Sequence, residues 1–305
     1  MVMKKIWTLL LCGLLFIGCF DDENIHAEYV DYGRIYDTTS TDPVMKYISQ
    51  YYYKYDKFLI VDPDTADYMF NFQSKNRVYI VKPKQETESL LKRLKFLEEI
   101  FLLGYNDDVK KNLFPNTIML ADTIYNLNKE EYVDMYLTGG YIAFRVNDAT
   151  LNMSETEKVE LSRKWNKEFL DYCTKKIGWT VPEEFYLYRT DDEYRKKENW
   201  WIPIPGATED EPADINIVWE RGYPVGTWYA QFDPWPNKVW GYMVQSSREQ
   251  YLTKFYEFLF TTPQEIIDKA ISDHAKLKKP HDVLDQALKD DFGIDYRTMV
   301  YKAKK

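Results

Sequence analysis

The chain has 305 residues, of which 45% are hydrophobic, 17% aromatic and 29% charged, and its formal net charge is −9. This length allows one large domain, or two modest lobes, with a hydrophobic core. A negative surface repels phosphate backbones and anionic headgroups, which excludes nucleic acid as a partner and membrane attachment through surface charge.

The N-terminus has the pattern of a bacterial lipoprotein signal. Lys4 and Lys5 precede the apolar run 6–17, and a glycine stands directly before Cys19. An apolar run of about a dozen residues is too short to span a bilayer and has the flanks of a cleaved secretory peptide. We therefore expect residues 1–18 to be removed and Cys19 to be lipidated, which anchors the protein to a membrane. A simple secreted protein cleaved elsewhere is the alternative.

The sequence after the signal predicts a tether and one domain of two lobes. The acidic residues 21–23 resemble a tag that directs lipoproteins to the outer face of the outer membrane, so we expect exposure at the cell surface. Residues 19–41 are polar and lack a sustained period, as expected of a flexible tether. The domain then covers 42–305, with an N-lobe of about 42–150 and a helical C-lobe of about 151–305.

Cysteine usage agrees with this interpretation. Cys12 leaves with the signal and Cys19 is lipidated, so Cys173 remains alone and no intramolecular disulfide is possible. Cys173 lies among apolar residues of a predicted helix, which favours a buried, inert thiol over a nucleophile.

Hydrophobic periodicity in the N-lobe alternates between helical and strand patterns. Asp42 and Pro43 provide a cap and a first-turn proline for a helix. Gly104 ends a long amphipathic helix. In chain order, we expect a helix at 44–51, strands at 58–61 and 78–81, a helix at 86–103, and strands at 116–120 and 141–146.

The C-lobe is predicted to be mainly helical. Ser154 and Glu157 form a capping-box pattern at the start of a long helix. The region 200–240 contains six tryptophans and many prolines without a clear period, which predicts a long structured loop. The helices expected are 155–176, 250–260, 262–278, with Thr262 as cap, and 282–291, ended by Gly293. The whole predicts an α+β fold.

Four segments in a fixed order resemble a known family. They are 137–147, the long helix with 182–185 after it, 236–243 and 289–295, and they span nearly the whole mature chain. In this order they resemble the substrate import-associated zinc metallohydrolase lipoproteins, which accompany SusC/SusD-type outer-membrane importers. The resemblance implies a zincin-like metallopeptidase fold and zinc-dependent peptidase activity.

The resemblance also implies where the zinc helix lies, and there the chain departs from the family. Lys167 and Asp171 stand at the positions of the two histidines of His-Glu-x-x-His, and only Glu168, the general base, is kept. Downstream, Lys238, Val239 and Tyr242 replace the acidic residues of the family. An ammonium group repels a divalent cation, and two carboxylates without imidazole or thiolate make a poor zinc site. We therefore expect zinc to be lost, no other cofactor, and Glu168 to be a vestigial general base.

Two weaker candidates for a metal site remain. His274 and His281 are seven residues apart, but Pro280 is expected to break or kink the helix between them, so we expect these histidines to be exposed or hydrogen-bonded. The aspartates of 62–67 bring oxygens together but lack the spacing of a known calcium loop.

The aromatic region offers a candidate ligand-binding surface. Trp228, Tyr229, Trp235 and Trp240 lie in the segment that borders the cleft in the resembled family, and flat rings suit sugar rings or peptide side chains. The alternative is that most of these rings fasten a long loop to the helices.

These observations predict an outer-membrane lipoprotein that is similar to zinc metallohydrolases but catalytically inactive. It is expected to be an accessory or binding component of a SusC/SusD-type importer, with a peptide or glycan ligand. Three alternatives stay open: an active metal-dependent peptidase with non-standard ligands, a glycan-binding surface lipoprotein, and a structural partner that clamps an importer.

Overall fold

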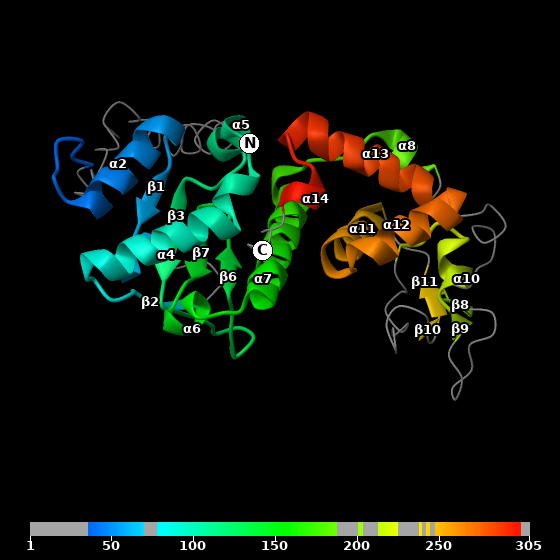
Figure 1. Ribbon diagram of the computed structural model, residues 1–305, viewed down its shortest axis with the longest axis horizontal. Coiled ribbons are helices and arrows are strands. Elements are labelled where there is room, and N and C mark those ends of the chain that lie inside the picture. The colour runs from blue at the N-terminus through cyan, green and yellow to red at the C-terminus, as the bar shows by residue number, and fades with distance from the viewer. Residues whose placement is uncertain are drawn as a thin grey trace, which may run out of the picture. The chain divides into compact units, whose positions relative to one another are not determined.

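A mixed four-stranded sheet organises the N-terminal part of the chain in the computed structural model (Figure 1). Its order is β1-β3-β7-β6, with β1, β3 and β7 parallel and β6 antiparallel to β7. Most residues of β3 and β7 are buried, as expected for strands covered on both faces. The strands are β1 (Phe58–Ile60), β3 (Thr117–Ala121), β6 (Met135–Leu137) and β7 (Tyr141–Arg145).

The structure describes residues 36–69, 78–187, 201–203, 213–224, 238–239, 242–244 and 248–299. By their contacts, residues 38–305 form one compact unit. Cys19, Trp228, Tyr229, Trp235 and Trp240 lie outside the described residues, so the structure does not test their predicted roles.

A second, antiparallel sheet has the order β2-β4-β5. In β2 (Val78–Val81), buried and exposed residues alternate, which is the pattern of a strand with one face on the core and one face on solvent. The strands β4 (Thr123–Asn126) and β5 (Glu131–Tyr132) complete this sheet. The sequence analysis predicted β1, β2, β3 and β7 within a residue or two and missed β4, β5 and β6.

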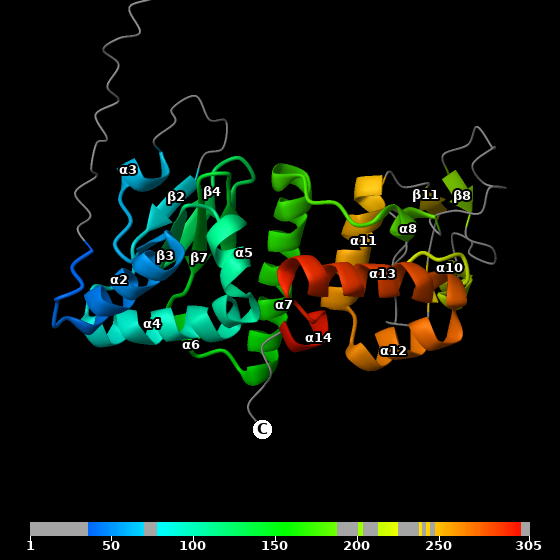
Figure 2. The ribbon, with the colours of Figure 1, turned by 90° about the horizontal axis from the view of Figure 1, so that it is seen from above.

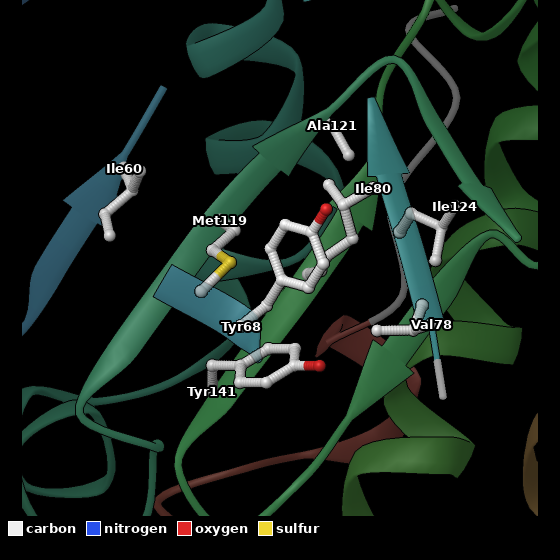
Figure 3. Packing of buried hydrophobic residues seen from close by; sticks show 9 residues of the cluster. Ile60, Tyr68, Val78, Ile80, Met119, Ala121, Ile124 and Tyr141 are labelled. Carbon is white, nitrogen blue, oxygen red and sulfur yellow. The ribbon is translucent and has the colours of Figure 1, made fainter. Parts of the chain in front are cut away.

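The main apolar cluster of this region lies between the two sheets (Figure 3). The four-stranded sheet contributes side chains from β1, β3 and β7, and the three-stranded sheet contributes side chains from β2 and β4. Tyr68, at the end of α3 (Thr65–Tyr68), belongs to the same cluster. One face of the three-stranded sheet therefore packs against the core. The cluster contains Ile60, Tyr68, Val78, Ile80, Met119, Ala121, Ile124, Tyr141 and Ala143.

Helices and turns join these strands, and their caps follow the sequence signals. The Asp42 carboxylate accepts hydrogen bonds from the backbone N–H groups of Val44 and Met45, at 2.7 and 2.9 Å, which confirms the predicted cap. The helices are α2 (Pro43–Tyr55), α4 (Thr87–Ile100), α5 (Asp107–Asn112) and α6 (Asp148–Leu151), with a 3₁₀ turn at Leu102–Gly104.

The long helix α7 (Glu155–Tyr172) joins the sheet region to the helical region. Its N-terminus has the predicted capping box, in which Ser154 and Glu157 bond reciprocally, and a π-helical turn (Cys173–Ile177) follows before left-handed Gly178. Trp165 packs against Phe144 of β7, with ring centroids 4.8 Å apart. The inward side of α7 is thus fixed by large apolar contacts.

The helical region after α7 differs from the prediction around His274. We predicted one helix over 262–278, but α12 (Gln264–Asp273) ends at His274 and α13 (Ala275–Phe292) continues past Pro280. The expected break at Pro280 was wrong. Pro280 lies in the second turn of α13, where it removes one backbone hydrogen bond, and its ring is buried.

The predicted cap of α12 was also wrong. The Thr262 hydroxyl is buried and makes no hydrogen bond, and Pro263 is the residue at the cap position. Gly293 ends α13 in the left-handed conformation, with φ of 65°, as predicted.

The remaining elements are short apart from α11 (Arg248–Thr261), which packs along α7 (Figure 2). Strand β8 (Trp201–Pro203) pairs with β11 (Tyr242–Val244), and β9 (Ala213–Asp214) pairs with β10 (Lys238–Val239). The others are α8 (Glu183–Tyr186), α10 (Asn216–Trp219) and α14 (Tyr296–Met299). Among the helices described, none combines the length and apolar character that crossing a bilayer requires.

Candidate functional site

The candidate site lies on the charged side of α7, opposite the buried side that fixes the helix. Trp165, Phe169 and Leu170 are fully buried, because apolar residues three and four apart share one side of a helix. The same periodicity places Lys167, Glu168 and Asp171 beyond the core contacts, where they are only partly buried. The sequence therefore brings these three side chains together through one turn of helix.

Lys167 and Asp171 interact with each other. The Lys167 Nζ lies 3.2 Å from Asp171 Oδ2, and the two side chains are only 22% and 15% exposed. Asp171 Oδ1 accepts a hydrogen bond from Thr253 Oγ1 of α11 at 3.1 Å. Lys175 Nζ lies 4.0 Å from the same Oδ1. Both carboxylate oxygens are therefore engaged by donors of the chain itself, and the contact joins α7 to α11.

Glu168 has the most perturbed carboxyl group of this side of α7. Burial raises its pKa to about 6, the positive charges of Lys164 and Lys167 oppose this shift, and Asp134 adds to it. A carboxyl with this pKa can exchange a proton near neutral pH. The chemistry available here is thus proton uptake and release by one carboxyl.

Asp134, just before β6, extends the charged cluster to the edge of the sheet. Its Oδ2 accepts from Lys164 Nζ at 2.7 Å, and its Oδ1 accepts from the Arg145 guanidinium. Burial alone would raise the pKa of Asp134, but the hydrogen bond and charge of Lys164, with Arg145, lower it. We name Asp134, Lys164, Lys167, Glu168 and Asp171 the α7 charged face.

Sequence reasoning missed Asp134, Lys164 and Thr253, and the last two illustrate different reasons. Lys164 stands four residues before Glu168, so helical spacing was a sufficient signal for it. Thr253 is separated from Asp171 by 82 residues, and only the packing of α11 on α7 brings the two together.

The other predicted site residues lie outside α7 or outside the residues that the structure describes. The backbone of Tyr242 is in β11, opposite Pro203 of β8, and its side chain is not described. The side chains of two other aromatic residues of the predicted loop, Trp219 and Tyr223, are described, and both are buried. Trp219 donates from its indole nitrogen to the Pro224 carbonyl at 3.0 Å, so this ring fastens its own segment.

The two histidines considered as metal ligands have hydrogen-bond partners, as predicted. His281 Nδ1 lies 3.0 Å from Asp282 Oδ1, and its Nε2 lies 3.1 Å from the Tyr296 hydroxyl. His274 Nε2 lies 2.9 Å from Asn216 Oδ1. Burial lowers the pKa of His281 despite the nearby carboxylate of Asp282.

The acidic segment 62–67 serves as a helix start. Asp64 Oδ1 accepts from the backbone N–H groups of Ala66 and Asp67, and Asp67 Oδ2 accepts from the Asp64 N–H. This reciprocal pattern is a capping box for α3. In the part of the chain that the structure describes, no group of three or more His, Cys, Asp or Glu side chains is arranged to hold a metal ion.

Cys173 is fully buried, and burial raises the pKa of its thiol far above the usual range. This confirms the predicted burial of the thiol, although the residue lies in the π-helical turn after α7.

A hollow of about 670 Å³ lies beside the first turns of α4 and α6. Two ion pairs line it, with Lys84 3.0 Å from Asp148 and Lys92 2.8 Å from Glu88, and Glu86 lines it as well. The hollow is therefore lined by charges of both signs.

Comparison with known proteins gives one result in structure and none in sequence. No protein-family profile matches the chain, and no curated protein matches it. Among solved structures, the fold is similar to that of a "putative zinc-binding metallo-peptidase" from Bacteroides caccae, with a TM-score of 0.46 and 12% sequence identity. The superposition covers 87% of this chain and 94% of that one.

Proposed function

We propose that this protein is a lipid-anchored, non-hydrolytic binding component at the bacterial outer membrane, built on a metallopeptidase-like scaffold. The observation that carries the non-hydrolytic part is the ion pair between Lys167 and Asp171. Each of these side chains stands where the resembled family has a zinc-binding histidine, and here they satisfy each other.

Metal binding by Lys167 and Asp171 would require two changes. The Lys167 ammonium would have to leave Asp171 and lose its proton, and Asp171 would have to give up the hydrogen bond from Thr253. Both changes cost free energy, because these side chains are largely buried and a separated charge there is poorly solvated. The arrangement supports a structural role for the α7 charged face.

The membrane part of the proposal is supported by the signal pattern that ends at Cys19. A peptide signal followed by a lipidated cysteine provides anchoring that the negative surface of the chain does not. The resemblance to importer-associated lipoproteins supports a SusC/SusD-type importer as the partner, with a peptide or glycan as ligand.

Fractionation of cells tests the anchoring. The full chain is expected in the outer-membrane fraction and accessible to protease added outside intact cells, whereas the Cys19→Ala variant is expected in the soluble fraction. Capture of a SusC/SusD-type pair by the wild-type chain from detergent-solubilised membranes would support the accessory role. Recovery of the wild-type chain in the soluble fraction contradicts the proposal.

A peptidase assay tests the absence of hydrolysis. The purified chain is incubated with a denatured casein digest and added zinc, and new peptides are followed by mass spectrometry. We expect the same background as in the Glu168→Gln variant. Cleavage that disappears in Glu168→Gln identifies an active hydrolase and overturns the proposal.

A further inference from the structure

Three tyrosines lie in a row across the outer side of the three-stranded sheet. Tyr79 of β2 is directly opposite Tyr125 of β4, and Tyr125 is directly opposite Tyr132 of β5. Tyr79 and Tyr132 are 58% and 67% exposed, and Tyr125 is partly buried between them. We name these three residues the tyrosine face.

The pleat of the sheet fixes this row on the outside. Val78, Ile80 and Ile124 alternate with the tyrosines and point into the apolar cluster between the two sheets (Figure 3). A shift of register by one residue would expose these three apolar residues, so the pairing that presents the tyrosines is strongly specified.

The strand spacing makes the row regular. Adjacent strands are about 4.8 Å apart, so the three tyrosine positions repeat at about that interval across the sheet. The Tyr125 and Tyr132 ring centroids are 5.0 Å apart with the planes at 65°. Tyrosine has only two side-chain torsions, and this contact restricts them further, so binding a ligand here costs little side-chain entropy.

The charge of the surface selects a neutral ligand. The outward residues beside the tyrosines are Val81 and Thr123, which are uncharged, in a chain of which 29% is charged. At the rim, Lys129 Nζ lies 3.5 Å from Glu131 Oε1, so the two charges compensate each other. Within the described strands, the outward side chains beside the tyrosines carry no charge that an ionic ligand could pair with, whereas phenol hydroxyls offer hydrogen bonds to neutral polar groups.

Cross-strand ring contacts stabilise a sheet, but they do not explain the exposure. Tyrosines that only support the sheet would lie down on it and bury their rings, whereas Tyr79 and Tyr132 keep more than half of their surface in solvent. An exposed row of large rings on one sheet is a typical feature of an interaction surface.

We propose that the tyrosine face binds a neutral oligosaccharide, with sugar rings packed against the two exposed tyrosines, Tyr79 and Tyr132. The interval between strands is close to the length of one sugar residue in an extended β-linked chain. The apolar C–H face of a sugar ring packs on a phenol ring, and its hydroxyl groups bond to the phenol oxygen. This inference names a ligand class for the proposed binding component, and it places the site on residues other than Trp228, Tyr229, Trp235 and Trp240.

Affinity electrophoresis of the full chain in native gels tests the site. The probes are soluble β-1,4-glucan, β-1,4-mannan, β-1,4-xylan and β-1,3-glucan, with heparin as the anionic control. We expect at least one neutral polysaccharide to retard the wild-type chain and heparin to have no effect. Calorimetry with the hexasaccharide of the retarding polysaccharide then gives the dissociation constant.

Matched variants assign the binding to the tyrosine face. Each of Tyr79→Ala and Tyr132→Ala should weaken the hexasaccharide by about tenfold, and the phenylalanine variants by much less, because they keep the ring. Tyr53→Ala, which removes a 65% exposed tyrosine of α2, is the control and should change nothing. Circular dichroism confirms folding of each variant.

Two results overturn the inference. One is the absence of retardation by all four neutral polysaccharides, and the other is retardation that Tyr79→Ala and Tyr132→Ala leave unchanged. If Trp228→Ala and Trp235→Ala abolish that retardation instead, the protein is a binding component as proposed, but the tyrosine face is not its binding site. If peptide hydrolysis is found but saccharide binding depends on Tyr79, the saccharide site is supported and the proposed absence of hydrolysis is contradicted.

Discussion

The α7 charged face and the tyrosine face are opposite kinds of surface. In the α7 charged face, Asp171 and Asp134 each accept from two partners of the same chain, so the charges of these two carboxylates are compensated within the protein. On the three-stranded sheet, large uncharged rings extend into solvent. Residues that resemble a catalytic motif by position can therefore serve structure, while residues outside any motif supply the surface suited to a ligand.

The largest effect on stability is expected at Asp134. Asp134→Ala leaves Arg145 and Lys164 without their carboxylate partner, and Arg145 is only 27% exposed. We expect a loss of about 2–3 kcal/mol in the free energy of unfolding, measured by urea denaturation. Glu183→Ala, which breaks an exposed ion pair with Arg248, is the control and should give no measurable change. Equal effects of the two substitutions would contradict a structural role for the α7 charged face.

The pH dependence of stability tests the environment of Glu168. Because its pKa is raised to about 6 in the folded protein, from the unfolded value near 4.5, the folded state binds more protons between these values. The stability that Glu168 contributes is therefore present below pH 4.5 and lost as the pH rises to about 6. Relative to wild type, Glu168→Gln should gain about 1–2 kcal/mol between pH 4.5 and pH 7.5. Urea denaturation of both proteins at the two pH values measures this difference, and a constant difference would refute the burial of Glu168.

Asp171 is expected to matter moderately. Asp171→Ala removes the acceptor of Lys167 and Thr253 and should cost about 1–2 kcal/mol, because the pair is largely but not fully buried. The matched control is Asp273→Ala, which breaks the exposed pair with Lys269 at the same helical spacing. Thermal unfolding of both variants measures the difference between their losses of stability. The two losses will be equal if the α7 pair is only a surface contact.

The smallest effect on stability is expected at the tyrosine face. Tyr79→Ala and Tyr132→Ala should each change the free energy of unfolding by no more than about 1 kcal/mol, the range of a cross-strand pair. The same substitutions are expected to weaken saccharide binding strongly. A loss of stability comparable to that of Asp134→Ala would show that these rings belong to the core of the sheet and not to a ligand surface.

Long periodic elements and their caps were predictable from the sequence. Asp42 and Ser154 stand at helix starts and cap them in the structure, and α7 follows from its apolar spacing. Local signals suffice for such elements because a cap and the first turn of its helix are neighbours in the chain.

The tyrosine row was not predictable, because it depends on the pairing of three strands and not on a local pattern. Tyr79 and Tyr132 are 53 positions apart in the sequence, and only the register of three strands puts them in line with Tyr125. The hydrogen bond from Thr253 to Asp171 has the same origin, since helix packing over a long sequence distance makes it.

The metal content of the purified full chain tests most directly the central claim that the α7 charged face is a structural network. Zinc is measured by mass spectrometry after mild dialysis of wild type and of Asp171→Ala, which changes a position where the resembled family has a zinc ligand. We predict the same trace amount in both proteins. One zinc ion per wild-type chain would contradict the account, and its loss in Asp171→Ala would place the metal at the α7 charged face.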